Sequence, residues 1–196
     1  MIKQTIFTDS LLIDYFNNED FVFLKETINT TLEEKKKINE YEKKSNIGGF
    51  QTKDISREQP KLCEYVLDKI VGMIKASYKF NNIKLHFHNM WINENMGHHF
   101  NTPHVHPKCD YSGVFYIQTP KDAGAIHFIR NDKSPSMGPH EFIFNDLDFT
   151  TEYVIMPEPK MIILFPSYLQ HMVLPHFKNE SRISSSFNLS LESEAN

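Results

Sequence analysis

"NTPHVHPKCDYSGVFYI", residues 101–117, places two histidines, His104 and His106, just before a proline and a run rich in strand-forming residues. Residues i and i+2 of a strand point to the same face, so a strand here would aim both imidazoles at one point. Because neutral imidazole is a frequent metal ligand, the pattern predicts half of a metal site. Such a site needs a third ligand from elsewhere in the chain.

The segments around this stretch, beyond residue 82, have the pattern of short strands. The first, residues 83–95, alternates so that Leu85, Phe87, Asn89, Trp91 and Asn93 are expected on one face. Further strands are expected at residues 112–118, 125–130, 152–156, 161–165, 171–174 and 182–191. Many short strands separated by turns predict a sandwich or barrel. The irregular segment 131–150 is expected to be an insertion or a lid.

The N-terminal part of the chain has the pattern of helices. Apolar residues at helical spacing predict a helix over residues 18–44, which Asn17 or Asn18 can cap. A second helix is expected to begin near Pro60, a favoured residue in the first turn. Its apolar stripe consists of Leu62, Val66, Ile70 and Met73.

Length and composition limit the class of protein. A chain of 196 residues, 40% hydrophobic and 23% charged, suits one domain over residues 1–196. Supporting helices and a first strand are expected in residues 1–80, and a β core in residues 81–196. The net charge of −4 does not indicate nucleic-acid binding, and no apolar run has membrane-spanning length. Two cysteines and an N-terminus without signal-peptide features predict a cytoplasmic protein.

His171 is the candidate third ligand. The chain has ten histidines, and a lone histidine is more often structural than a ligand. His171 differs because "LFPSYLQHMVLP" (164–175) places it between two apolar runs near the end of the β core.

Arg182 begins the last expected strand, in a chain that otherwise prefers lysine. One face of that strand is wholly polar: Arg182, Ser184, Ser186, Asn188 and Ser190. This face can simply meet solvent. Alternatively, Arg182 and Ser184 form a site for a carboxylate, because the planar guanidinium suits bidentate binding and the hydroxyl adds a donor.

Five pieces of the sequence, in order, resemble one known family. They are "WINEN" (91–95), "HVHP" (104–107), "SGVFYI" (112–117), "FPSYLQH" (165–171) and "RISSSFN" (182–188), and "IGGFQT" (47–52) adds an N-terminal signature. Together they resemble the Fe(II)/2-oxoglutarate-dependent oxygenases, in particular a subgroup with the pattern HxHP…FPSxLxH…RISxSFN. The resemblance extends over roughly residues 45–190.

The resemblance implies a mostly β fold with N-terminal helices, the double-stranded β-helix or cupin-like jelly-roll barrel. It implies Fe(II) and 2-oxoglutarate as cofactors. The implied reaction is hydroxylation of a small-molecule or peptidyl substrate, with release of succinate and CO2. Since the family occurs in bacteria and their phages, the expected location is bacterial cytoplasm, or host cytoplasm for a phage enzyme.

The resemblance also implies roles for single residues. His104 matches the first metal ligand and His171 the distal one. Arg182 and Ser184 match the residues that bind the far carboxylate of 2-oxoglutarate, and Tyr116 resembles a tyrosine that supports it.

The sequence departs from the wider family at the second metal ligand, which is usually a carboxylate. Here the position holds His106, and three interpretations are open. His106 is itself a ligand, Asp110 supplies the carboxylate through a local bulge, or water or a halide fills the position. We favour His106, because its spacing is right and Pro107 biases it toward an extended backbone.

The substrate side of the site is less defined. Trp91, Asn93 and Asn95 either line the pocket, or serve as a core residue and hydrogen-bonding residues at a strand end. Two other functions compete with the oxygenase. One is a three-histidine cupin-type metalloenzyme without 2-oxoglutarate, and the other is a non-catalytic barrel that binds a ligand. The Arg182 and Ser184 pair favours the oxygenase, because a cupin of that type does not need it.

Overall fold

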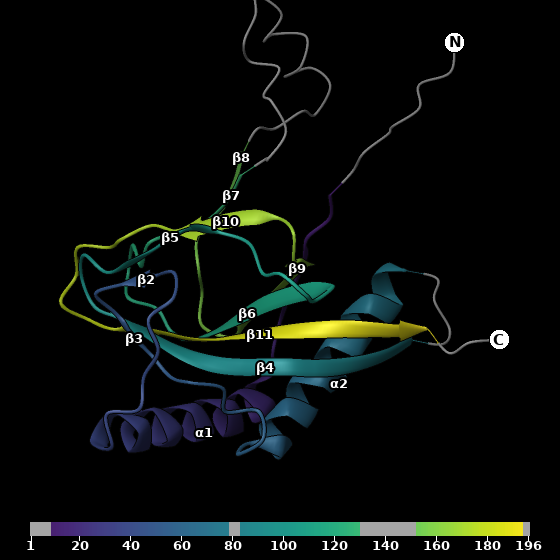
Figure 1. Cartoon of the computed structure of the whole chain (residues 1–196), viewed down its shortest axis with the longest axis horizontal. Helices are drawn as coiled ribbons and strands as arrows, with labels where there is room; N and C mark the ends of the chain where they lie inside the picture. Colours follow the sequence, from purple (N-terminus) through teal and green to yellow (C-terminus); the bar gives the residue numbers. More distant parts are fainter. Residues whose placement is uncertain (1–8, 79–82, 130–151, 194–196) are drawn as a thin grey trace, which may run out of the picture.

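Two antiparallel sheets form the framework of the molecule (Figure 1). The structure, a computed structural model, describes residues 9–78, 83–129 and 152–193. The large sheet has the order β1 (Leu12–Tyr15), β9 (Met161–Pro166), β6 (Tyr111–Gln118), β11 (Arg182–Ser193), β4 (Ile83–Asn95), β3 (Phe50–Gln51). The small sheet has the order β2 (Asn46–Ile47), β5 (Phe100–His104), β10 (Gln170–Val173), β7 (Ile126–Ile129), β8 (Glu152–Ile155).

The order of the strands is that of a jelly roll, in which neighbours in a sheet are distant in sequence. β9 lies between β1 and β6, and β10 lies between β5 and β7, so each sheet is built from separated segments. All strand pairs in the described residues are antiparallel. The expected double-stranded β-helix with N-terminal helices is therefore confirmed. The segment 131–150 lies outside the described residues, so its role as a lid remains a prediction.

Two helices cover the outer face of the large sheet. α1 (Asn18–Lys37) and α2 (Pro60–Ser77) lie beneath β4 and β11, on the side away from the small sheet (Figure 1). The apolar side chains of α2 predicted from the sequence (Leu62, Val66, Ile70, Met73) are all buried. They share one cluster with Ile92, Phe115 and Phe187 of the sheet. Because this outer face is closely packed against the helices, the large sheet is a rigid support for the residues on its inner face.

The inner face of the large sheet meets a second apolar cluster and a cavity. The cluster includes Val114, Tyr116, Ile163 and Phe165 from the large sheet and Phe128 from the small one. The cavity of about 570 Å³ extends alongside, between strands of both sheets. On β11 the polar residues Arg182, Ser184, Ser186 and Asn188 line this cavity. The polar face of the last strand thus meets the cavity and not bulk solvent.

The predicted alternation along β4 is wrong at one point. Asn89 pairs with Asn188, but Phe87 pairs with Leu189, so His88 is an extra residue in β4. Such a β-bulge changes which face the following residues occupy. Leu85 and Phe87 consequently pack against the cluster between the helices and the large sheet, whereas Asn89, Trp91 and Asn93 line the cavity.

The first helix is shorter than predicted: it ends at Lys37 and not at residue 44. Asn17 caps its start by accepting a hydrogen bond from the Asp20 amide, as expected. Asn39 takes a left-handed conformation (φ 54°), which stops the helix. Lys35 is buried and pairs with Glu40 and Glu58, which holds the chain after the turn against the helix.

No helix in the described residues is both long enough and apolar enough to cross a membrane. Both cysteines, Cys63 and Cys109, are free thiols.

Candidate active site

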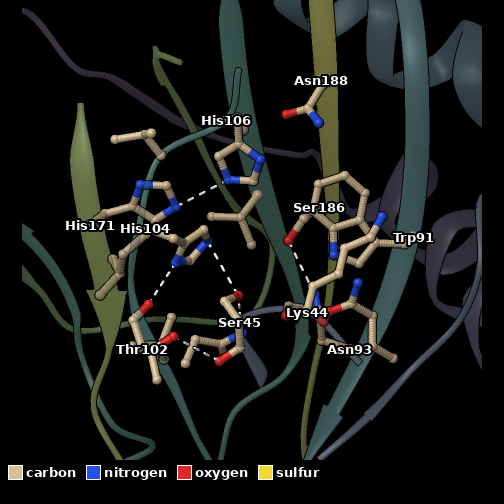
Figure 2. A pocket seen from close by; sticks show the side chains of 18 of the residues that line it. Lys44, Ser45, Trp91, Asn93, Thr102, His104, His106, His171, Ser186 and Asn188 are labelled. Atoms are coloured by element: carbon tan, nitrogen blue, oxygen red, sulfur yellow. Dashed lines mark hydrogen bonds between the residues drawn. The ribbon is translucent and has the colours of Figure 1, made fainter. Parts of the chain in front are cut away.

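Three imidazoles converge on one side of the cavity (Figure 2). His104 ends β5, His106 follows two residues later, and His171 lies on β10 directly opposite His104. Their candidate ligand nitrogens all lie within 4.8 Å of one another, and the Nε2 atoms of His106 and His171 are 3.2 Å apart. Two ligand atoms that each lie about 2.1 Å from one metal, in adjacent coordination positions, are about as far apart as these two Nε2 atoms. The three donors therefore fit a single metal ion.

Backbone carbonyls orient two of these rings. His104 Nδ1 donates to the carbonyl oxygen of Thr102 (2.7 Å), and His171 Nδ1 donates to that of Leu169 (2.9 Å). Since a carbonyl can only accept, each ring carries its proton on Nδ1 and presents the Nε2 lone pair to the centre of the cluster. Hydrogen bonds of this kind fix the tautomer and the direction of metal-binding histidines.

The environment favours neutral imidazoles, which are the form that binds a metal. Burial lowers the pKa of His104, and lowers that of His106 to about 4 and that of His171 to about 3. The neighbouring imidazoles add to the effect at His106 and His171, and Lys44 adds to it at His106. Because the three imidazoles are neutral, protons do not compete with a metal cation for their nitrogen lone pairs.

His106 lies beyond the last paired residue of β5, and two contacts hold it in place. Its backbone amide donates to the carbonyl of Ser167 (2.9 Å), and the Trp91 indole stacks on its ring at 5.7 Å between centroids. Asp110, the alternative ligand, is directed elsewhere: its carboxylate accepts from the Leu191 amide (2.8 Å). In the described residues the cluster contains three histidines and no carboxylate.

Arg182 supplies a buried positive charge in the wall of the same cavity. Its side chain is 3% exposed, and Nη1 donates to the carbonyls of Ala123 (2.8 Å) and Gly124 (3.0 Å). No Asp or Glu of the described residues pairs with it. Burial lowers the pKa of Arg182, and the neighbouring Tyr116 opposes this shift in part. A buried cation without a carboxylate partner is costly, so the site suits an anionic ligand.

Two hydroxyls accompany this guanidinium. Ser184 pairs with Tyr116 on β6 and with Asn93 on β4, which places the three side chains in one row across the sheet. Burial raises the pKa of Tyr116 to about 12, so its hydroxyl remains a hydrogen-bond donor. Arg182, Ser184 and Tyr116 therefore offer a charge and two O–H donors to a carboxylate.

The residues expected on the substrate side also lie at the cavity. Trp91, Asn93 and Asn95 line it, and Asn93 Nδ2 donates to Ser186 Oγ (3.2 Å). Two buried amide atoms, Asn93 Oδ1 and Asn95 Nδ2, have no partner among the described residues. Unpaired buried polar atoms are uncommon and call for a ligand or water.

Sequence reasoning missed several residues of the cavity wall: Lys44, Ser45, Asn89, Ser186 and Asn188. Ser186 and Asn188 had a signal, because they share the Arg182 face of the last strand. Lys44 and Ser45 had none, since they belong to a charged stretch that resembled the end of a helix. Ser45 Oγ nevertheless lies 3.4 Å from His104 Nε2, and its backbone carbonyl accepts from Thr102 N.

The family model described as "Putative 2OG-Fe(II) oxygenase" matches residues 89–188, which is half of the chain and contains all three histidines and Arg182. The chain belongs to this family of 2-oxoglutarate- and iron-dependent oxygenases. The resemblance seen in the sequence is thereby confirmed, and so are Fe(II) and 2-oxoglutarate as the cofactors of the family. None of the curated protein sequences matches this oxygenase.

Solved structures similar to this oxygenase share its fold at low sequence identity. A prolyl-4-hydroxylase from Pseudomonas putida is 14% identical with a TM-score of 0.60, over 93% of this chain and 94% of the other. HygX from Streptomyces hygroscopicus, with nickel and 2-oxoglutarate bound, is 12% identical with a TM-score of 0.60, over 93% and 83%. A viral collagen prolyl hydroxylase from Paramecium Bursaria Chlorella virus-1 is 13% identical with a TM-score of 0.56, over 91% and 95%.

Proposed function

We propose that this protein is an Fe(II)/2-oxoglutarate-dependent hydroxylase whose metal is held by His104, His106 and His171. One observation carries the proposal: three oriented neutral imidazoles line the same cavity as a buried arginine that has no Asp or Glu partner among the described residues. Imidazoles alone also suit zinc and other metals. The buried Arg182 adds a place for a carboxylate, which a metalloenzyme without 2-oxoglutarate does not need.

The chain's own residues position the cosubstrate. Arg182, Ser184 and Tyr116 would bind the far carboxylate of 2-oxoglutarate, and the three histidines that line the same cavity would hold the metal. Bound Fe(II) and 2-oxoglutarate supply the oxidation: 2-oxoglutarate, O2 and a substrate C–H bond give succinate, CO2 and the hydroxylated substrate. The protein contributes orientation and a shielded cavity.

The three neutral ligands change the charge of the centre. A centre with two histidines and a carboxylate carries one negative ligand, and this site carries none. The metal therefore keeps one more unit of positive charge, which strengthens its attraction for the dianionic 2-oxoglutarate. Trp91, stacked on His106, fixes the direction of the third imidazole.

Hydroxylation is the favoured outcome because two of the similar structures, from Pseudomonas putida and the Chlorella virus, are prolyl hydroxylases. The substrate is expected to be a small molecule or a peptide that enters this cavity.

Turnover of 2-oxoglutarate in the absence of added substrate tests the proposal. Protein reconstituted with Fe(II) in air should convert 2-oxoglutarate slowly to succinate, measured by chromatography. The variants His104→Ala and His171→Ala should show no conversion, whereas His86→Ala, on an exposed part of β4, should match the wild type. Bound iron with no 2-oxoglutarate consumption would favour a three-histidine enzyme of another kind, and failure to bind iron would favour a non-catalytic barrel.

A further inference from the structure

The wall of the cavity has an uneven charge. Among the described residues that line it, Lys44 and Arg182 are cationic and none is Asp or Glu. Glu42, which contacts this wall through Lys44, is not itself a lining residue. A positively charged substrate would have no acidic partner among these described lining residues, whereas a negatively charged substrate could pair with Lys44.

The charge persists when the cofactors proposed above are bound. The two negative charges of 2-oxoglutarate balance the two positive charges of Fe(II), and the neutral imidazoles add no charge. Arg182 and Lys44 then leave two positive charges in a partly enclosed space. Arg182 is taken by 2-oxoglutarate in the proposed function, so Lys44 is the charge that remains for a second ligand.

Lys44 is placed to bind such a ligand at the edge of the cavity. Its side chain is 61% exposed, and Figure 2 shows it in front of Trp91 and Asn93, across the cavity from the three histidines. Its positive charge acts on His106. Its partner in the structure, Glu42, is 2.7 Å away and also solvent-accessible. Exposed pairs of this kind contribute little stability, so a ligand carboxylate can replace Glu42 at small cost.

A hydrogen-bonded chain orients a second donor toward the cavity. Ser112 Oγ donates to Asn188 Oδ1 (2.7 Å), and Asn188 Nδ2 donates to Asn89 Oδ1 (2.9 Å). This bond fixes the orientation of the Asn89 amide. Its Nδ2 group has no partner in the described part of the chain, and Asn89 lines the cavity. The network therefore leaves an N–H donor for an oxygen of a ligand.

We infer that the substrate oxidised at this site carries a carboxylate, which Lys44 binds, and a second oxygen acceptor, which Asn89 Nδ2 binds. Small organic acids without an ammonium group fit this description, and substrates recognised through a cationic group do not. The inference rests on the proposed function, because it takes Arg182 to be occupied by 2-oxoglutarate.

Matched small probes test the inference on the whole chain. Protein is loaded anaerobically with Fe(II) and saturating 2-oxoglutarate, and the visible charge-transfer band verifies that both are bound. Propionate, propionamide and propylammonium are then titrated at constant ionic strength. Trp91 is the only tryptophan of the chain and lines the cavity, so its fluorescence reports their binding.

Propionate should bind roughly tenfold more tightly than propylammonium. Lys44→Gln should lose this preference, and the matched change of its exposed neighbour, Lys43→Gln, should keep it. Equal or tighter binding of propylammonium, no fluorescence response to any probe, or an unchanged preference in Lys44→Gln would overturn the inference while the proposed function stands. Absence of the visible band despite bound iron would instead contradict the proposed function, and this inference with it.

Discussion

Arg182 is the residue at which a conservative change is most informative. Its Nη1 group already donates to the carbonyls of Ala123 and Gly124, so the rest of the guanidinium is left for the carboxylate of the proposed cosubstrate. Lysine has a single ammonium group and cannot make both sets of contacts. Arg182→Lys should therefore weaken 2-oxoglutarate binding by about 10- to 100-fold, the equivalent of one charge-assisted hydrogen bond. The dissociation constant is measured anaerobically from the visible band.

The control for this change is Arg57→Lys, because Arg57 is exposed and does not line the cavity. It should leave 2-oxoglutarate binding as in the wild type. An unchanged dissociation constant in Arg182→Lys would remove Arg182 from the 2-oxoglutarate site.

Tyr116 should contribute one neutral hydrogen bond to the same carboxylate. Tyr116→Phe removes only the hydroxyl, and we expect 2-oxoglutarate binding to weaken by about 2- to 12-fold. Because burial raises the pKa of Tyr116 to about 12, the hydroxyl stays protonated up to strongly alkaline pH. The ratio of the two dissociation constants, wild type to variant, should thus stay constant between pH 6 and 9, and a ratio that changes with pH would show that the phenol ionises in this range.

At the scale of elements, the turn between β6 and β7 is expected to support Arg182. Gly124 has φ 76°, and a Cβ there would lie 2.1 Å from the Leu174 carbonyl oxygen and 3.1 Å from Arg182 Nη1. Gly124→Ala should lower the free energy of unfolding by at least about 1–2 kcal/mol, and should also weaken 2-oxoglutarate binding. Urea unfolding measures the first effect.

Gly72 offers the matched control, because a Cβ at this position of α2 meets no atom within 4 Å. Gly72→Ala should raise the free energy of unfolding by about 1 kcal/mol, since alanine is the better helix former. Equal effects of the two substitutions would mean that the conformation of Gly124 has no part in the fold.

The long elements could be predicted from the sequence because their signals are local. Helical periodicity marked α2 from Pro60, and alternation in β11 placed Arg182, Ser184, Ser186 and Asn188 on one face. The bulge at His88 could not be predicted, because it depends on the pairing of β4 with β11. The two-residue strands β2 and β3 form only against β5 and β4, so their own residues carry no signal.

The candidate site was predictable where one strand carries several of its residues. The HxH pattern and the Arg-x-Ser pair contribute four side chains, and all four line one cavity together with His171. Lys44 and Ser45 reach the same cavity from a loop after α1, and tertiary contacts with β5 bring them there. That contact joins segments about sixty residues apart and has no local pattern.

At the scale of the whole molecule, the bound ligands should connect the two sheets. His104 and His171 belong to the small sheet, and Arg182, Ser184 and Tyr116 belong to the large one. Ligands that bind only the folded state stabilise it, by about 4 kcal/mol at 1,000 times the dissociation constant. Nickel, an inert substitute for iron, should raise the melting temperature, and 2-oxoglutarate should raise it further only when nickel is present.

Thermal unfolding of His171→Ala provides the comparison. This variant should melt at the same temperature with and without nickel and 2-oxoglutarate. A ligand-induced increase equal to that of the wild type would place the metal elsewhere in the chain.

The measurement that tests the account most directly is an anaerobic titration of the metal-free protein with Fe(II) and then 2-oxoglutarate, in the wild type and in His106→Ala. The account predicts a visible charge-transfer band in the wild type, and loss of both iron binding and the band in His106→Ala. An iron-loaded wild type without the band would contradict the chelation of 2-oxoglutarate. A variant that keeps the iron affinity and the band would contradict the three-histidine centre.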